Sequence, residues 1–315
     1  MEEVAFAKGR GIDTIITDHH EPKDVLPEAC AIINPKVIGD KYPGGELSGV
    51  GVAFKFAQAI YRRLGQDEGE LEEQMDLVAL GTAADIVPLV GENRILTKFG
   101  MAQIARTTKP GLKSLIFVSG ILGQKIGTGQ VVFILAPRIN AVGRLGDADL
   151  AIKLLTTRDE SKAAEIARIL NEENQRRKSI DETTLAEALD MIAEDVDMAS
   201  DKAIVLASSG WHQGVIGIVA SRLVERFHRP TIMIAIEGNE GKGSARSIPR
   251  FHLYEALREC EDCLVKYGGH KYAAGLSILP EKIQPFREKF KKVSDAKLSA
   301  EDLVPRLSID SQLDL

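Results

Sequence analysis

The stretch that decides the fold is Asp13-Thr14-Ile15-Ile16-Thr17-Asp18-His19-His20, in which a short apolar run leads directly into three titratable side chains. Such a run of β-branched residues is typical of a buried strand in a parallel sheet, and ligands in open α/β sheets gather beyond the carboxyl ends of strands. Side chains alternate along an extended segment, so Asp18 and His20 should share one side while His19 points to the other. One imidazole is then placed for a metal and its neighbour for a substrate, with Asp18 as a histidine's carboxylate partner or as a direct ligand. A turn capped by the aspartate, with two solvated histidines, is the alternative.

Composition and charge restrict the class of protein. The 315 residues, 44% of them hydrophobic, provide material for two compact domains. No apolar stretch reaches the roughly 18 residues of a membrane-spanning helix, and Met1-Glu2-Glu3-Val4 lacks the basic-then-apolar order of a signal peptide. Three cysteines are too few for a disulfide framework, so we expect a cytoplasmic protein with no membrane partner. The net charge of -6 argues against coating DNA by bulk electrostatics, but it is compatible with a narrow basic channel that grips one strand end.

Hydrophobic periodicity predicts an α/β fold with two α/β domains around a central cleft. Residues 159–194 keep a helical period with many charges and neither glycine nor proline, so one long helix with a solvated charged face should connect the domains. A second α/β unit then follows, with strands at 203–207, 231–236, 242–247 and 273–279 and a helix at 253–267. The expected organisation is a partial first domain at 1–157, the connecting helix at 158–197, a second domain at 198–294 and the start of a truncated domain at 295–315.

Four further stretches carry polar chemistry and follow the Asp-His-His triplet in a fixed order. They are Gly81-Thr82-Ala83-Ala84-Asp85-Ile86-Val87-Pro88-Leu89, Ala136-Pro137-Arg138-Ile139-Asn140-Ala141-Val142-Gly143-Arg144, Gly243-Ser244-Ala245-Arg246-Ser247 and Gly268-Gly269-His270-Lys271-Tyr272-Ala273-Ala274-Gly275. The triplet resembles the signature of the DHH phosphoesterase superfamily. The whole set, in this order, resembles the RecJ-like bacterial single-strand-specific exonucleases, which join a DHH domain to a DHHA1 domain. The resemblance runs over nearly the whole chain.

The resemblance implies a two-metal site in the first domain. His19 and Asp85 would be metal ligands, Asp18 would orient the site or bind metal itself, and His20 would face the scissile phosphate. The cations would be two Mn²⁺ or Mg²⁺ ions, which activate water and stabilise charge on the phosphoryl oxygens. Spacing alone instead favours a helix-end cap or a loop hydrogen bond for Asp85.

The resemblance also implies that Arg138, Asn140 and Arg144 contact the nucleic-acid strand. Arginine suits phosphate because its guanidinium is a planar fork of donors, and the small residues between these side chains allow close approach. Salt bridges within the domain are the alternative for the two arginines.

In the second domain the resemblance implies a site for the 5′-phosphate. Ser244 and Arg246 are two residues apart in a predicted strand and therefore share a face. Gly268 and Gly269 would let backbone amides approach phosphate, and His270 would be a further donor. An ordinary half-exposed strand is the alternative for the Ser/Arg pair.

The sequence departs from the family pattern upstream of Asp18. The family's two earlier acidic motifs belong there, but only seventeen residues precede Asp18, with Asp13 the sole aspartate among them. Two cations need roughly three more carboxylates than His19 and Asp85 supply. We therefore expect an N-terminally truncated enzyme, inactive or nearly so as this chain.

The function expected from the resemblance is 5′-to-3′ hydrolysis of single-stranded DNA from a 5′ end. Two alternatives stay open: a DHH phosphoesterase acting on oligoribonucleotides or dinucleotides, and a non-catalytic single-strand-binding relative. Protein partners such as a helicase or a single-strand-binding protein have no signature in the sequence.

Overall fold

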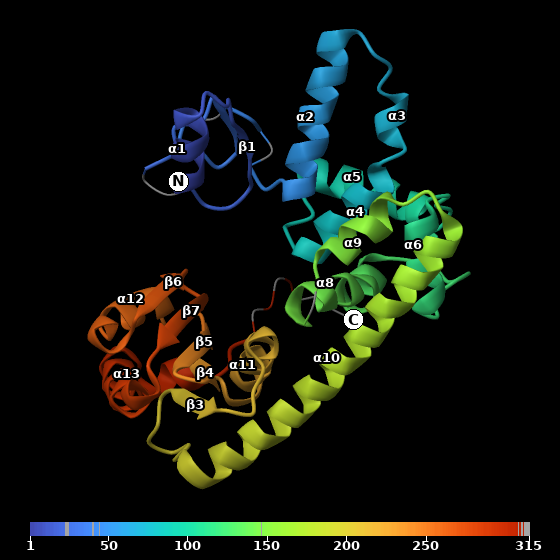
Figure 1. Cartoon of the computed structure of the whole chain (residues 1–315). Coiled ribbons are helices and arrows are strands. Elements are labelled where there is room, and N and C mark those ends of the chain that lie inside the picture. The colour runs from blue at the N-terminus through green and yellow to red at the C-terminus, as the bar shows by residue number, and fades with distance from the viewer. Residues whose placement is uncertain are drawn as a thin grey trace. The chain divides into compact units, whose positions relative to one another are not determined.

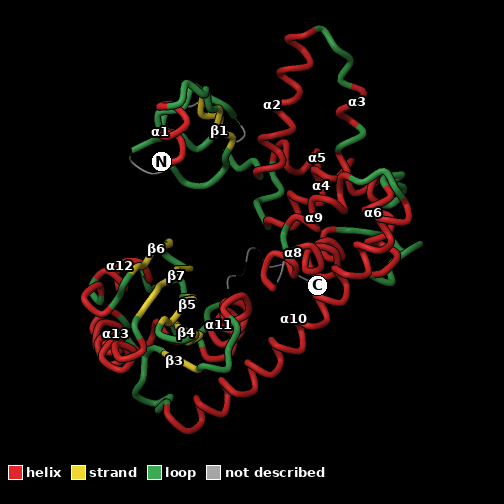
Figure 2. Tube along the Cα trace, viewed as in Figure 1, coloured by secondary structure: helices red, strands yellow, loops and turns green. Residues whose placement is uncertain are grey.

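The computed structural model of the chain describes residues 1–22, 25–39, 41–43, 45–145, 147–307, 309 and 311. The chain forms two compact units, Met1–Asn174 and Gln175–Leu315. Helices dominate the first unit, and the larger sheet belongs to the second (Figure 1, Figure 2). The predicted α/β class is confirmed. None of the described helices is long and apolar enough to span a membrane.

A small parallel sheet begins the first unit after helix α1 (Glu2–Gly9). Strand β1 (Ile15–Thr17) pairs with β2 (Ala31–Ile33), with Ile15 opposite Ala31. The prediction of a buried strand is wrong, since Ile15 is exposed and Ile16 is only half-buried. The reason is that β1 has a single hydrogen-bonded neighbour among the described residues. Both strands nevertheless end at the same edge, as parallel strands must.

Eight α-helical segments follow before the long connecting helix, counting described residues only. They are α2 (Gly49–Leu64), α3 (Gly69–Glu72), α4 (Met75–Asp85), α5 (Gly91–Ile104), α6 (Pro110–Val118), α7 (Thr128–Gln130), α8 (Ala136–Leu145) and α9 (Asp149–Thr156). Ser48 caps α2 by accepting a hydrogen bond from the Gly51 amide. Helices α3 and α4 are separated by the short segment 73–74. Fully buried leucines, among them Leu112, Leu135 and Leu154, form the core of this unit.

A π-helical segment, η1 (Val131–Leu135), leads into α8. Its widened turn is closed by a hydrogen bond from the Ala136 amide to the Val131 carbonyl. Pro137 follows directly, and a proline inside a regular helix lacks an amide and collides with the carbonyl four residues earlier. The π turn therefore lets the helix continue through Pro137 and carry Arg138, Asn140 and Arg144.

The long helix predicted over 159–194 is confirmed as α10 (Glu160–Asp195). Its charged face is not fully solvated as expected, because Arg177 and Asp181 are buried. Arg222 of helix α11 (Gln213–Phe227) reaches the Asp181 carboxylate at 3.2 Å. Burial raises the pKa of Asp181, and the two arginines oppose that shift. The boundary between the two compact units falls inside α10, after Asn174.

The second unit is built on a five-stranded sheet. In order across the sheet, the strands are β3 (Ile204–Ser208), β4 (Thr231–Glu237), β5 (Glu240–Arg246), β7 (Ala273–Ile278) and β6 (Lys266–Gly269). Only β3 and β4 are parallel to each other. Helix α11 lies on one face, and α12 (Leu253–Arg258) and α13 (Ile283–Lys297) lie on the other (Figure 1). All four predicted strands are confirmed.

One predicted element of this unit is wrong. The helix expected over 253–267 ends at Arg258, and Lys266–Gly269 is instead the edge strand β6, with Tyr267 paired to Leu276. Cys260 and Cys263 lie between these elements in the hydrophobic core. Helix α13 continues to Lys297 across the expected domain start at 295, and a 3₁₀ turn follows at Ala300–Leu303. Of the expected further domain, residues 308, 310 and 312–315 lie outside the described residues.

Candidate active site

The Asp-His-His triplet continues from the carboxyl end of β1. Asp18 and His20 meet as predicted, but the rings of His19 and His20 lie 4.4 Å apart, so His19 does not point to the opposite side. Asp18 Oδ1 lies 2.7 Å from His20 Nδ1, so these two residues share a side. The same oxygen accepts the amides of His19 at 2.7 Å and of His20 at 3.2 Å. Burial opposes the charge on Asp18, but the hydrogen bonds from His20 and His19 outweigh it and lower the pKa of that carboxyl. The histidine that Asp18 orients is therefore His20.

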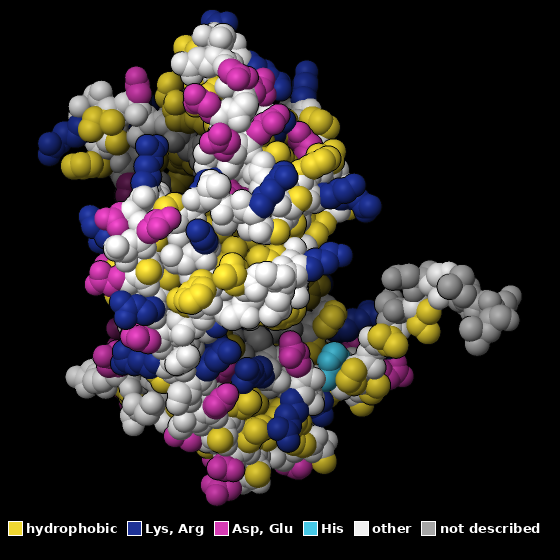
Figure 3. All heavy atoms as spheres, turned by 90° about the vertical axis from the view of Figure 1, so that its right-hand side faces the viewer, with side chains coloured by type: hydrophobic (Ala, Val, Ile, Leu, Met, Phe, Trp, Pro, Cys, Tyr) yellow, Lys and Arg dark blue, Asp and Glu magenta, His cyan; other side chains and the backbone are white. Residues whose placement is uncertain are grey.

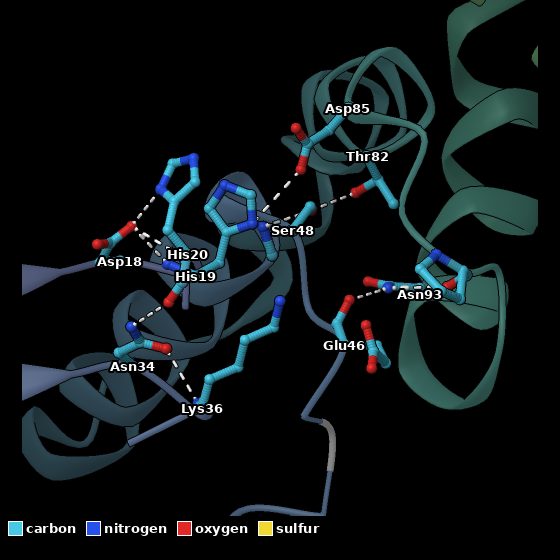
Figure 4. A network of polar contacts seen from close by, with 12 residues as sticks. Asp18, His19, His20, Asn34, Lys36, Glu46, Ser48, Thr82, Asp85 and Asn93 are labelled. Atoms are coloured by element: carbon cyan, nitrogen blue, oxygen red, sulfur yellow. Dashed lines mark hydrogen bonds and ion pairs between the residues drawn. The ribbon is translucent and has the colours of Figure 1, made fainter. Parts of the chain in front are cut away.

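The ring of His19 lies beside that of His20 and meets Asp85. Its Nδ1 lies 3.4 Å from Asp85 Oδ2, although 65 residues separate the two in the sequence (Figure 4). The His19 side chain is 17% exposed and that of Asp85 is 38% exposed, so solvent reaches both groups. Gly49, at the start of α2, leaves room for the imidazole: a Cβ there would stand 3.0 Å from His19 Cδ2. Imidazole nitrogen and carboxylate oxygen thus converge from two motifs.

The end of α4 is fixed so that Asp85 faces the triplet. Thr82, one turn before Asp85, shares a buried hydrogen bond of 2.8 Å with Ser48, the cap of α2. Ile86, which follows Asp85, has a φ of 60°, a left-handed conformation that is costly for a β-branched residue. The strained residue ends the helix directly after Asp85 and turns the chain away.

Two buried or half-buried asparagines complete this network, and sequence reasoning missed both (Figure 4). Asn34, just after β2, donates from Nδ2 to the His20 carbonyl at 2.9 Å. Asn93, in the first turn of α5, donates to the carbonyls of Glu46 at 2.5 Å and Pro88 at 3.0 Å. Together they tie the segment after His20 and the loop after Asp85 to their neighbours. An asparagine after a predicted strand was the one sequence signal available for Asn34.

In the second unit, Ser244 and Arg246 share the face of β5 that lies under α11. Arg246 Nη1 donates to Ser244 Oγ at 3.2 Å and to the Ala245 carbonyl at 2.8 Å. Gly217 of α11 lies directly above them, since a Cβ there would stand 2.8 Å from Ser244 Oγ and 3.1 Å from Arg246 Nη2. The predicted common face is confirmed.

A cavity of about 490 Å³ opens beside this pair. The strand register places Ser244 opposite Gly275, and Gly275 opposite Gly268, so three small residues form a row across β5, β7 and β6. Lys242 and Lys266 also line the cavity. A single lysine in a strand belongs to no recognisable sequence motif. The sequence therefore did not indicate these two lysines as candidate site residues. The arrangement brings a hydroxyl and two ammonium groups around an open floor, and the ammonium group of Lys242 also pairs with the Glu240 carboxylate.

Gly269 and His270 lie at the end of β6. Gly269 has a φ of 143°, and a Cβ there would stand 2.5 Å from the Ala273 carbonyl oxygen, so only glycine fits. His270 is exposed, and its amide donates to Ala273 at 2.8 Å. The Gly-Gly-His stretch is therefore a strand end and turn.

The three candidate residues on α8 differ in their surroundings. Arg138 donates from Nε to Asn171 at 3.0 Å and from Nη1 to the Ile134 carbonyl at 2.6 Å, and burial lowers its pKa. Asn140 and Arg144 are exposed and four residues apart, which places them on one helix face. Arg138 thus makes hydrogen bonds within its own unit, which are not the salt bridges given as the alternative, while Asn140 and Arg144 are exposed.

Comparison with known proteins identifies both halves of the chain. The DHH family N-terminal domain matches residues 1–82, and the DHHA1 domain matches residues 200–295. A crystal structure of exonuclease RecJ bound to manganese superimposes with a TM-score of 0.80 at 36% identity, covering 95% of this chain and 73% of that one. The chain belongs to the RecJ family.

Other RecJ proteins are also similar to this chain. RecJ from Thermus thermophilus in complex with Mn²⁺ superimposes with a TM-score of 0.84 at 36% identity, covering 94% of this chain and 43% of that one. The single-stranded-DNA-specific exonuclease RecJ of Bacillus subtilis strain 168 is 44% identical over 98% of this chain and 39% of its own length. For RecJ of Escherichia coli K12 the identity is 41%, over 91% of this chain and 53% of that protein. The chain thus spans between about two fifths and half of these relatives.

The candidate site offers the kinds of ligand atom that bind divalent cations. The described residues supply only part of a ligand set. Mn²⁺ and Mg²⁺ prefer carboxylate oxygen, and Mn²⁺ also accepts imidazole. His19 and Asp85 supply one group of each kind. Within the described ranges, no third histidine, cysteine, aspartate or glutamate joins them in a metal-binding cluster. Asp18 is turned toward His20 and away from that pair.

Proposed function

We propose that this chain is the two-domain body of a RecJ-type exonuclease that hydrolyses single-stranded DNA from its 5′ end. The observation that carries the proposal is the meeting of His19 and Asp85, 3.4 Å apart, from two family motifs. Membership of the RecJ family supports the same reaction, because the relatives are named single-stranded-DNA-specific exonucleases. We also place the protein in the cytoplasm, where its three unpaired cysteines would stay reduced.

His19 and Asp85 would hold divalent cations, and His20 would face the scissile phosphate. Bound Mn²⁺ or Mg²⁺ activates water and stabilises the charge that develops on the phosphoryl oxygens. Asp18 keeps the His20 ring in place through its 2.7 Å hydrogen bond and so directs the second ring nitrogen outward. His20 is 72% exposed and therefore open to a substrate, in contrast to His19.

Ser244 and Arg246 would hold the terminal phosphate of the strand. The cavity beside Ser244 brings Lys242 and Lys266 to the same place, and Gly268 and Gly275 leave its floor open. Ammonium and hydroxyl groups in such a hollow suit a phosphate monoester with two negative charges. His270, Gly269 and Arg138 would act at the margins, and Asn140 with Arg144 would contact the strand further along.

The described residues place no third ligand beside His19 and Asp85, so further carboxylate ligands would complete the site. The test is a nuclease assay with Mn²⁺ on 5′-phosphorylated single-stranded DNA. It compares this chain with a version extended by the upstream acidic segment of a RecJ relative. The extended protein should release 5′-mononucleotides, and this chain alone should release few.

Variants and substrates in the same assay separate the alternatives. His19→Ala in the extended protein should lower the rate at least about 100-fold. Faster cleavage of dinucleotides than of long strands would establish a small-substrate phosphoesterase instead. Strand binding without cleavage in the extended protein would establish a non-catalytic binding protein.

A further inference from the structure

A second polar pocket lies in the first unit, away from His19 and Asp85. It has a volume of about 520 Å³ and is lined by residues from the start of α4, the end of α5, the loop before α6 and the loop before α10. Asp76 at this pocket and Asp85 stand nine residues apart on α4, which is about 14 Å along a helix axis. The pocket is therefore distinct from the candidate metal site.

Three cations line this pocket: Arg106, Lys109 and Arg158. Arg106 and Lys109 flank the turn between α5 and α6, and Arg158 comes from the loop before α10, so the helical packing of the unit brings them together. Arg106 and Arg158 are exposed, and neither side chain has a hydrogen bond or ion pair to another described residue.

The third cation, Lys109, is held in place by a buried carboxylate. Asp76 is 2% exposed, and its carboxylate accepts Lys109 Nζ at 2.8 Å and Thr107 Oγ1 at 2.8 Å. Lys109 Nζ also donates to the Glu73 carbonyl at 2.5 Å. A buried carboxylate is costly unless paired, so this network holds Lys109 and Thr107 in one geometry at the pocket wall. Asp76 is paired with Lys109, and among the residues that line the pocket the other carboxylate is that of the exposed Glu73.

The lining also limits what the ligand can be. Threonine hydroxyls and glutamine amides complete the wall, and none of the residues that form it is aromatic. Nucleic-acid sites that follow a strand use aromatic side chains to stack bases, whereas guanidinium groups recognise phosphate directly. A pocket of this volume matches a small molecule.

We infer that this pocket is a binding site for a small oligophosphate, the di- or triphosphate group of a free anion or nucleotide, held by Arg106 and Arg158 with Lys109. The ligand is read through its phosphate groups, and the site is independent of the proposed nuclease function. Its distance from Asp85 makes it an accessory site on the same unit.

The test is calorimetric titration of the 315-residue protein with inorganic pyrophosphate in EDTA, which keeps divalent cations out of the measurement. Arg106→Ala/Arg158→Ala should weaken binding at least about 10-fold, and Arg106→Lys/Arg158→Lys should retain part of it. The control Arg94→Ala/Lys113→Ala removes two exposed cations from α5 and α6 outside the pocket and should leave binding unchanged.

Several outcomes would overturn the inference. If the Arg106→Ala/Arg158→Ala variant and its control lose affinity for pyrophosphate equally, the anion is attracted by bulk charge. If the Arg106→Ala/Arg158→Ala variant binds pyrophosphate as tightly as the unaltered protein, the anion binds elsewhere. If a 5′-hydroxyl oligonucleotide binds through Arg106 and Arg158 and pyrophosphate does not, the pocket reads a nucleic-acid backbone instead. Melting temperatures should match across the variants, because the exposed side chains of Arg106 and Arg158 lose no hydrogen bond or ion pair to a described residue.

Discussion

His19 and His20 are neighbours in sequence, with rings 4.4 Å apart, yet they have different surroundings. His19 is 17% exposed and faces Asp85, whereas His20 is 72% exposed and faces Asp18. The alternation of side chains in an extended segment predicted the pairing of Asp18 with His20, but it wrongly placed His19 on the other side. It did not predict which carboxylate would meet His19, because that depends on where α4 ends in space.

Replacing Asp18 separates orientation from metal binding. Asp18→Asn should lower the nuclease rate of the extended protein about 10- to 100-fold, because the ring of His20 loses its charged partner. Affinity for Mn²⁺, measured by titration, should change little, since His19 and Asp85 are intact. Loss of Mn²⁺ binding in this variant would show that Asp18 is itself a ligand.

Ile86 should carry conformational strain that glycine would relieve. Ile86 directly follows Asp85 and has a φ of 60°. Its side chain is 73% exposed, so little packing depends on it. Ile86→Gly should raise the free energy of unfolding by about 1 kcal/mol in a urea titration. Val304→Gly, at an exposed residue with a φ of -95°, should instead leave stability unchanged or lower it. An equal response of both variants would count against strain at Ile86.

The three cysteines should differ in reactivity with pH. Cys30 is exposed, and Cys260 and Cys263 are buried. Burial raises the pKa of Cys260 to about 12, so its thiol stays protonated, and unreactive, at any pH where the protein is normally handled. Alkylation of the folded protein at about pH 8, close to the ordinary pKa of an exposed thiol, should modify Cys30 alone, and denaturant should release the other two. Modification of Cys260 in the folded state would mean that this core opens readily.

At the scale of elements, the approach of α11 to β5 decides the geometry of the Ser244 and Arg246 pair. Gly217 is the contact point, and a Cβ there would collide with Ser244 Oγ at 2.8 Å. The sequence predicted both elements from periodicity, but it did not show that a helical glycine above them matters. The close approach of two elements cannot be predicted from the hydrophobic pattern of either element.

Gly217→Ala should therefore weaken recognition of the 5′-phosphate. The added methyl must displace the Ser244 hydroxyl, while alanine is about 1 kcal/mol more favourable than glycine within a helix, so stability should hold. Fluorescence anisotropy should show a several-fold loss of affinity for a 5′-phosphorylated oligonucleotide and none for its 5′-hydroxyl counterpart. Gly129→Ala, in a helical segment with open space around the added Cβ, is the matched control. Equal affinity losses for both oligonucleotides would contradict a phosphate-specific role.

Strong periodicity predicted the elements well, and weak signals predicted them poorly. The long helix α10 and the strands β3, β4, β5 and β7 were all expected at close to their observed positions. The helix predicted through Tyr267 failed because the pairing of β6 with β7 overrides local helical preference in Lys266–Gly269. The π turn at Val131–Leu135 was also missed, although Pro137 in a helical stretch is a signal for it.

At the scale of the whole chain, the candidate residues divide between the two compact units. The Asp-His-His triplet and Asp85 belong to Met1–Asn174, while Ser244, Arg246 and the cavity lysines belong to Gln175–Leu315. Motifs in order along the chain were sufficient to indicate the RecJ family. Residues without a motif, such as Asn93, Lys242 and Lys266, became visible only through the fold. On the face drawn in Figure 3, acidic and basic side chains are interspersed, as expected for a net charge of -6.

The most direct test of the central claim is whether Mn²⁺ binds between His19 and Asp85. The chain has six histidines, and the NMR signals of their ring nitrogens can be followed while substoichiometric Mn²⁺ is added. The paramagnetic ion should broaden His19 first and His20 next, leave His212, His228 and His252 sharp, and lose this selectivity in Asp85→Asn. If His19 stays sharp in the unaltered chain, or broadens equally in Asp85→Asn, the proposed metal site is wrong.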